Sequence, residues 1–371
     1  MTTRQYGLAT AVADHTAPRE QLHRFLRRVV KARAAPEKAD RAVAFLDSVH
    51  QGTGIEHRYT AIEDYTKTDP ADFDFFPPNW RLDPFPSTAR RMEIYEPTSV
   101  ELAERACRRA LRDASVDADD VTHLVVVTCT GLFAPGPDIL LVRRLGLRPD
   151  TRRTNIGFMG CYGAFNGLRM ADQIVRSDPQ AVVLKVCVEL CSLHYQIDLR
   201  PQTMVGNCLF GDGCAAAVYA ASDRFDGGHL DVLHTHCHIT HDSLHQMQWH
   251  IGDEGFSMVL DVEIPKTLRS GGARFIDTLL AGARRARDDV DAWVVHPGGP
   301  RIIDAVRDAG ELDEKDVSIS RSVLRDFGNM SSPTVLFVLK RQLRHSSAGD
   351  ELAMLGFGPG LTMEGALLRV I

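Results

Sequence analysis

Short apolar runs rich in β-branched residues recur along the chain, and they restrict the possible folds more than any other feature. Segments with helical periodicity, such as residues 99–114 and 164–177, lie between several of these runs. Nearly continuous apolar strands must be covered on both faces, so the alternation predicts an α/β protein. The runs interpreted as buried strands are 123–129, 181–188, 213–220, 292–296, 334–339 and 366–371.

The pattern also contains an internal repeat. Residues 119–131 comprise an acidic turn, a buried strand and a glycine loop, and residues 288–299 repeat this order about 170 positions later. Such a repeat predicts two similar halves whose strand-end loops meet at one central site. The predicted halves are residues 1–220 and 221–371.

Two segments are expected at the surface. Residues 66–98 are rich in Pro, Asp and aromatic residues, which predicts an irregular excursion before a long helix that begins near Ser99. An early helix carries a cluster of basic residues interleaved with Leu, Phe and Val, which is typical of a solvated amphipathic face. The basic residues of that helix are Arg24, Arg27, Arg28, Lys31 and Arg33.

Composition argues against several classes of protein. The 43 basic and 49 acidic residues give a formal charge of -6, which does not favour a nucleic-acid partner. No apolar run reaches the ~18–20 residues needed to span a bilayer, and no secretory signal is visible. The eight cysteines include no CxxC pair and lie mostly in apolar stretches, which predicts reduced thiols in a cytoplasmic protein.

Cys161 lies between two glycines in the stretch NIGFMGCYGAF, just before a segment with an apolar helical stripe. A thiol at a helix N-terminus is favourably placed to ionise, because unpaired amides and the helix dipole stabilise a thiolate. The flanking Gly160 and Gly163 permit a sharp turn and close approach of a substrate carbonyl. A buried structural cysteine is the alternative interpretation.

Two later loops favour the nucleophile. His296 ends the run AWVV and begins the loop PGGP, and Asn329 lies in FGNMSSP. Each alone is more often structural, but a Cys, a His and an Asn in glycine-flanked loops suit thioester chemistry. A thiolate attacks an acyl thioester, and hydrogen-bond donors stabilise the oxyanion that forms when a malonyl thioester decarboxylates.

Six stretches give the chain a specific resemblance to bacterial type III polyketide synthases, members of the chalcone synthase superfamily within the thiolase fold. They occur in the family's order from about residue 90 to the C-terminus. The stretches are GLRPDTRRTNIGFMGCYGAFNGLR, VCVELCSLHYQ, GNCLFGDGCAAAV, VVHPGGPRIIDAV, FGNMSSPTVLFVL and GFGPGLTMEGALL. The resemblance implies a five-layer αβαβα fold of two similar halves, the first carrying the nucleophile and the second the His and the Asn.

The resemblance also implies an activity, that of an acyltransferase which extends an acyl-CoA starter by decarboxylative Claisen condensation with malonyl-CoA. Cys161 would carry the acyl group, while His296 and Asn329 would stabilise the enolates. Phe210 matches the family's gatekeeper, and Arg58 lies near a position that binds coenzyme A in relatives. No cofactor or metal is implied, and a homodimer is expected. The remaining cavity residues implied are Thr130, Cys191, His194, Trp249, Phe256, Ser331, Gly358 and Pro359.

Several positions depart from the plant enzymes. Trp249 replaces a small glycine, Cys191 and His194 replace a pair of threonines, and Tyr162 and Phe165 replace small residues. These changes make chalcone an unexpected product and favour an alkylpyrone, resorcinol, phloroglucinol or naphthalene type made in secondary metabolism. A ketoacyl synthase III-like enzyme that performs one condensation is the alternative activity, and a non-catalytic scaffold homologue is the alternative class.

One histidine-rich stretch, residues 229–250, lies outside these motifs. His234, His236 and His238 have period two, so they would share one face of a strand, where they could bind a transition metal. A solvent-facing strand is the favoured interpretation, because the reaction needs no metal.

Overall fold

The apolar runs form the strands of two half-sheets in the computed structural model, which describes residues 2–371. The half-sheets join where Thr3–Gln5 pair with Leu230–Val232, which gives the order β11-β12-β13-β8-β1-β7-β6-β4-β5. The first half-sheet contains β1 (Thr3–Val12), β4 (His123–Thr128), β5 (Arg152–Gly157), β6 (Val183–Leu190) and β7 (Asp212–Ala221). The second contains β8 (Leu230–Ile239), β11 (Ala292–Val295), β12 (Glu351–Gly358) and β13 (Thr362–Val370).

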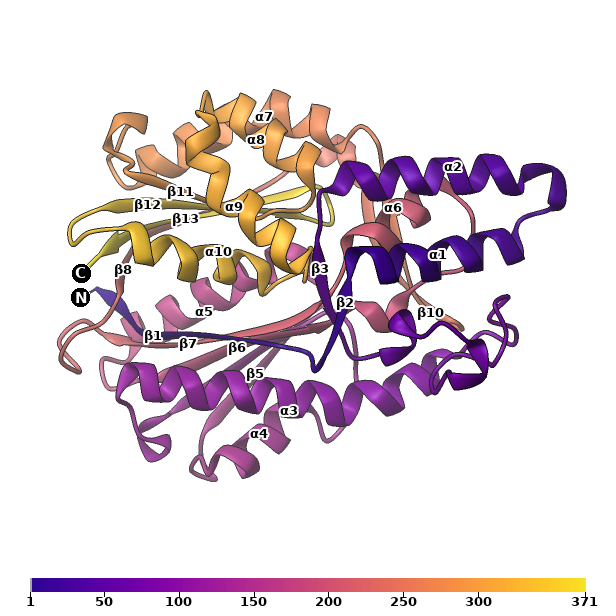
Figure 1. Ribbon diagram of the computed structural model, residues 1–371. Coiled ribbons are helices and arrows are strands. Elements are labelled where there is room, and N and C mark those ends of the chain that lie inside the picture. Colours follow the sequence, from indigo (N-terminus) through magenta and orange to yellow (C-terminus); the bar gives the residue numbers. More distant parts are fainter. Residues whose placement is uncertain (1) are drawn as a thin grey trace.

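Helices lie between the half-sheets and on both outer faces (Figure 1). The middle layer consists of α5 (Gly163–Ser177) and α10 (Thr334–Gln342). One outer layer holds α3 (Thr88–Ala114) and α4 (Pro137–Leu145), and the other holds α7 (Ile264–Gly282) and α8 (Pro300–Gly310), with α9 (Glu314–Phe327) beside β11. This order of layers confirms the predicted αβαβα fold. The division at residue 220 stays a prediction.

The internal repeat corresponds to equivalent elements of the two halves. A 3-10 turn, η3 (Ala118–Asp120), leads into β4, and a second turn, η7 (Arg287–Asp289), leads into β11. Both strands pair in parallel with a neighbour, β4 with β5 and β6 and β11 with β12. Parallel strands present their carboxyl ends at one edge, and this is why loops from both halves meet at the site described below.

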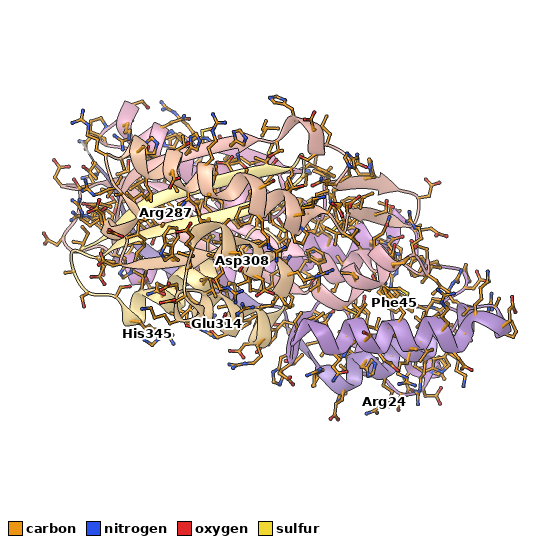
Figure 2. All side chains as sticks on the ribbon, turned by 90° about the horizontal axis from the view of Figure 1, so that it is seen from above. Arg24, Phe45, Arg287, Asp308, Glu314 and His345 are labelled. Carbon is orange, nitrogen blue, oxygen red and sulfur yellow. The ribbon has the colours of Figure 1, made fainter. Side chains whose placement is uncertain are left out.

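A smaller group of elements projects from the layers beside this edge (Figure 1). Figure 2 labels Arg24 and Phe45 on its helical hairpin. The basic helix has an apolar side, where Phe25, Leu26 and Val29 are buried, so the predicted amphipathic character is confirmed. The group contains β2 (His15–Pro18), α1 (Arg19–Arg33), α2 (Pro36–Thr53), β3 (His57–Thr60), α6 (Pro201–Leu209), β9 (Met247–Gly252) and β10 (Gly255–Leu260).

Two predictions of secondary structure were wrong. Residues 334–339 form part of α10 rather than a strand. The prediction failed because a short apolar run has no period that separates a buried strand from a helix buried on all sides. The helix expected near Ser99 begins at Thr88, with Ser87 as its N-cap and Pro97 in its interior. The preceding segment lies mostly at the surface, as predicted, but its Phe75 and Phe76 are buried and anchor it to the core.

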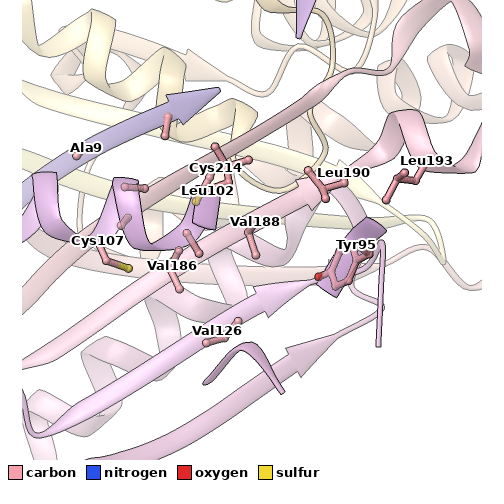
Figure 3. Close-up of a cluster of buried hydrophobic side chains, with 14 of the residues drawn as sticks. Ala9, Tyr95, Leu102, Cys107, Val126, Val186, Val188, Leu190, Leu193 and Cys214 are labelled. Carbon is pink, nitrogen blue, oxygen red and sulfur yellow. The ribbon is translucent and has the colours of Figure 1, made fainter. Parts of the chain in front are cut away.

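Figure 3 shows how α3 covers the first half-sheet. Leu102 of the helix lies beside Cys214 of β7 and Cys107 lies beside Val186 of β6, and all four side chains are buried. Close packing of this kind restricts the strands, so the loops at their ends start from fixed positions.

Candidate active site

Cys161 lies in the 3-10 turn η4 (Gly160–Tyr162), whose last residue, Tyr162, is the N-cap of α5. The predicted position at a helix N-terminus is confirmed. Gly160 has φ +68°, and a Cβ there would lie 2.7 Å from Pro359 Cδ, so the turn depends on glycine. The side chain of Cys161 is 8% exposed and faces a cavity.

The side-chain amide of Asn329, from the other half of the chain, lies next to the Cys161 thiol. Its Nδ2 is 3.8 Å from Cys161 Sγ and donates to Gly298 O at 3.4 Å. Its Oδ1 lies 3.9 Å from the same sulfur and accepts from the Ser331 amide at 2.8 Å, which holds the amide group beside the thiol. The main chain of Asn329 also forms a parallel bridge with Phe210, so the predicted gatekeeper and the amide lie side by side.

His296 follows β11, where its amide donates to Leu355 O at 2.8 Å. The imidazole is 1% exposed, lines the same cavity, and neither ring nitrogen has a partner in residues 2–371. A buried imidazole without a protein partner is unusual, since buried polar groups are generally hydrogen-bonded. Its two nitrogens are therefore available to a bound substrate.

Burial keeps both the thiol and the imidazole neutral. Desolvation raises the pKa of Cys161 to about 11, although hydrogen bonds from Ser331 and Asn329 act in the opposite direction. Desolvation also lowers the pKa of His296 to about 3. These shifts favour the neutral thiol and the neutral imidazole in the ligand-free protein.

The cavity has a volume of about 510 Å³, within the range of small-molecule sites. It contains the three predicted catalytic residues and nearly all the predicted cavity residues. Gly358 is the exception, because it packs behind the nucleophile, where an added Cβ would meet Tyr162 at 2.5 Å. The predicted residues that line the cavity are Cys161, His296, Asn329, Phe210, Thr130, Cys191, His194, Trp249, Phe256, Ser331, Pro359 and Arg58.

Glu189, at the end of β6, was missed by the sequence analysis. Its carboxyl group accepts hydrogen bonds from the Cys129 amide at 2.9 Å, Thr130 Oγ1 at 2.8 Å and Ser332 Oγ at 2.6 Å. Burial raises its pKa to about 7, partly offset by these hydrogen bonds. It ties loops of both halves together beneath the cavity. An acidic residue next to the end of a mostly apolar strand was the signal that could have identified it.

Three rings of the cavity lining contact one another, and we call Trp249, His194 and Phe256 the aromatic wall. His194 stacks on Phe256 with centroids 4.1 Å apart, and Trp249 meets both edge-on at 5.6 and 5.8 Å. His194 Nδ1 accepts from the Phe256 amide at 3.0 Å, so its Nε2 carries the hydrogen that is donated to Thr130 O at 2.6 Å. Desolvation lowers the pKa of His194 to about 3, so this ring is neutral.

Arg58 lines the cavity but does not lie on an exposed basic rim. Its side chain is 2% exposed and its stem lies against Gly211 and Gly328. Its Nη1 donates to Asn207 O at 3.2 Å, while its Nη2 has no partner in residues 2–371. Desolvation lowers the pKa of this guanidinium to about 10. The predicted contact with coenzyme A therefore stays a prediction.

The histidine-rich strand lies elsewhere. In β8, His236 stacks on Phe275 at 5.4 Å and His234 lies against Gly282. Within residues 2–371, no group of three or more His, Cys, Asp or Glu side chains is arranged to hold a metal ion. The same residues contain no helix long and apolar enough to cross a membrane.

Gly160→Ala tests how strictly the turn controls the nucleophile. We expect a loss of about 1–2 kcal/mol in the free energy of unfolding from the left-handed backbone, and a further loss from the clash with Pro359. Condensation should slow at least about tenfold because Cys161 moves. Gly146→Ala is the matched control, since Gly146 has φ +72° but open space around it. Urea unfolding and turnover are measured for both variants. An equal loss of turnover in Gly160→Ala and Gly146→Ala would contradict the prediction.

His296 should make stability depend on pH. Its pKa is about 3 when folded and 6.5 in its ordinary state, so unfolding takes up a proton between these values and stability is lost as pH falls below about 6.5. We expect wild type to lose up to about 1.4 kcal/mol per pH unit more than His296→Gln across this window. Urea unfolding of both proteins at pH 7.5 and pH 5 measures the difference, and parallel pH dependences would refute it.

Comparisons with known proteins agree with this geometry. Residues 6–223 match the family described as chalcone and stilbene synthases, N-terminal domain, and residues 233–371 match the C-terminal domain of the same family. An alpha-pyrone synthesis polyketide synthase-like protein, Pks18 of Mycobacterium tuberculosis, is 33% identical over 93% of this chain and 88% of its own length. A 1,3,6,8-tetrahydroxynaphthalene synthase of Streptomyces peucetius subsp. caesius is 34% identical over 89% of this chain and 84% of its own length.

Solved structures extend the likeness to the whole fold. PKS-I from the brown alga Ectocarpus siliculosus superposes with a TM-score of 0.91 at 31% identity, covering 100% of this chain and 98% of that chain. Some relatives are much larger than this chain. Probable polyketide synthase 1 of Dictyostelium discoideum is 33% identical over 72% of this chain, and the match covers only 9% of that protein. The two matched domains, the thiolase-type fold and these relatives show that the chain belongs to the chalcone and stilbene synthase family, the type III polyketide synthases.

Proposed function

We propose that the protein loads an acyl-CoA starter onto Cys161 and extends it repeatedly with malonyl-CoA before releasing a cyclised aromatic or pyrone product. The observation that carries this proposal is the meeting of three groups in one cavity. They are a thiol at a helix start, an amide nitrogen 3.8 Å from its sulfur, and a buried imidazole with two unpartnered nitrogens.

Loading requires a thiolate. As Cys161 Sγ bonds to the starter carbonyl carbon, His296 takes the thiol proton, and the bond to coenzyme A breaks. The departing coenzyme A thiolate then accepts that proton, so the enzyme is left neutral and acylated. The N-terminal end of α5 favours negative charge developing on the sulfur.

Extension requires a carbanion. Malonyl-CoA loses CO₂ by cleavage of its carbon–carbon bond, and the electron pair becomes an enolate whose oxygen needs donors. Neutral His296 and Asn329 Nδ2 supply N–H groups there. The enolate carbon then bonds to the acyl carbonyl carbon, and Cys161 Sγ leaves as the thiolate. Repetition of both steps lengthens the chain.

The test is mass spectrometry of products from malonyl-CoA with acetyl, short-chain, long-chain and aromatic acyl-CoAs. A product that contains several malonyl units supports the proposal. Addition of one ketide only, with strict dependence on a carrier protein, would instead support a ketoacyl synthase III-like activity. Absence of malonyl-CoA turnover with every starter would support a scaffold homologue.

We further propose that the active form is a homodimer that needs no cofactor. The edge strand β5 ends the sheet, so one side of its backbone has no strand partner in residues 2–371. Leu132, beyond β4, and Ile139, in α4, leave 54% and 37% of their surfaces exposed. An open edge with nearby apolar groups suits pairing with a second copy.

Light scattering tests the dimer, since two copies of the 41.1 kDa chain double the mass. Leu132→Asp should favour the monomer, and a wild-type monomer at micromolar concentration would overturn this proposal.

Turnover by metal-free protein in buffer that contains only the thioester substrates tests the independence from cofactors. A cytoplasmic location also stays a prediction, supported by eight free cysteines.

A further inference from the structure

Arg91, on the first turns of α3, is a buried guanidinium held by backbone carbonyls rather than by a carboxylate. Its side chain is 0% exposed. Its Nε donates to Pro86 O at 3.1 Å, and its Nη1 donates to Leu193 O and, at 3.5 Å, to Tyr195 O. A buried charge is costly unless specific partners compensate it, and these contacts offset part of that cost, while Nη2 has no partner in residues 2–371.

Aromatic rings complete its surroundings. The guanidinium carbon lies 4.7 Å from the centre of the Phe85 ring and 5.7 Å from that of Phe75. Stacking on aromatic faces is a property of the planar, weakly hydrated guanidinium, and lysine reproduces it poorly. The site is therefore specific for the shape of arginine as well as for its charge.

The carbonyls that Arg91 binds belong to the segment that carries His194 of the aromatic wall. Leu193 and Tyr195 are its two neighbours, and Leu193 and His194 belong to the 3-10 turn η5 (Cys191–His194). With both flanking carbonyls held by one guanidinium, the backbone at His194 has little freedom to shift.

On another side, Arg91 contacts the hairpin of β9 and β10, which carries the other two wall residues, Trp249 and Phe256. Gly255, between Trp249 and Phe256, has φ +98°, and a Cβ there would lie 2.7 Å from Arg91 Nε. The neighbouring Thr88 strengthens the same contact, since its amide donates to Asp253 O at 2.7 Å and its Oγ1 accepts from the Gly255 amide at 2.8 Å. The start of α3 thus holds the turn between β9 and β10.

We propose that Arg91 is a positioning residue that holds the aromatic wall at its present depth and thereby sets the length of acyl chain that the cavity accepts. Arg91 is absent from the cavity lining, so its effect passes through the backbone of the wall. The wall is coupled internally, because the Phe256 amide donates to His194 and the two rings stack, so a shift of either segment moves both rings. This inference rests on the proposed polyketide synthase activity.

The test uses Arg91→Lys, Arg91→Met and Gly255→Ala, the last of which displaces the guanidinium without removing it. Arg90→Lys is the matched control, because Arg90 is the neighbouring residue but is exposed and forms an ion pair with Glu93. Each variant is assayed for malonyl-CoA decarboxylation, for KM and kcat with acyl-CoAs of increasing length, and for product size.

We expect the three variants to keep decarboxylation within about threefold of wild type, since Cys161, His296 and Asn329 do not touch Arg91. The KM for the preferred starter should rise about tenfold or more, and the distribution of starter and product lengths should shift. Arg91→Lys should be affected less than Arg91→Met, and Arg90→Lys should match wild type.

Folded variants with unchanged length distributions would overturn the inference, as would loss of decarboxylation and extension in equal proportion. If the Arg91 variants do not fold, Gly255→Ala decides, and a wild-type length distribution in that variant rejects the inference. A wild-type protein that turns over no malonyl-CoA would instead reject the proposed function, so the two failures are distinguishable.

Discussion

Cys161→Ala is expected to lower polyketide formation by at least about 10³-fold, because no acyl group can then be held covalently for extension. Decarboxylation of malonyl-CoA should persist, since His296 and Asn329 keep their N–H groups. Intact-protein mass spectrometry after incubation with an acyl-CoA should show an acyl adduct on wild type and none on the variant.

Cys187→Ala is the control for this experiment. Cys187 is fully buried in β6 outside the cavity, and burial raises its pKa to about 11, as it does for Cys161. This variant should still be acylated and active. An adduct that survives in Cys161→Ala, or disappears in Cys187→Ala, would remove Cys161 from its proposed role.

His296→Gln and Asn329→Ala should each lower malonyl-CoA decarboxylation by about 10²–10³-fold, which is typical of losing one donor to a developing oxyanion. Extension should fall by at least as much, because each extension consumes one decarboxylation. The effect should appear mainly in kcat, since the donors act on charge that develops in the transition state. Release of CO₂ from labelled malonyl-CoA measures this step directly.

The double variant of His296→Gln and Asn329→Ala shows whether the two residues act on the same oxygen. If both N–H groups bind the same oxygen, the losses should be less than additive, because one donor contributes little after the other is gone. Ser322→Ala is a control in the same half of the chain, since its hydroxyl bonds to Ile319 O on α9, away from the cavity. Decarboxylation that remains within threefold of wild type in either single variant would reject the assignment of that residue.

Part of the fold follows from local patterns in the chain. The runs at 123–129 and 181–188 predicted strands correctly because strands buried on both faces need almost unbroken apolar sequence. The run at 334–339 was misassigned because α10 is enclosed between two half-sheets, and a helix buried on every side has no polar stripe to reveal its period.

The residues proposed to carry the chemistry could be recognised from local patterns, since Cys161, His296 and Asn329 lie in glycine-flanked segments. Their surroundings could not, because these come from the packing of the folded chain. Glu189 beneath the cavity, the neutral state of His194 and the support of the wall by Arg91 depend on contacts between segments distant in sequence. Burial shifts the pKa of such groups, and burial is a property of the packed chain rather than of any residue alone.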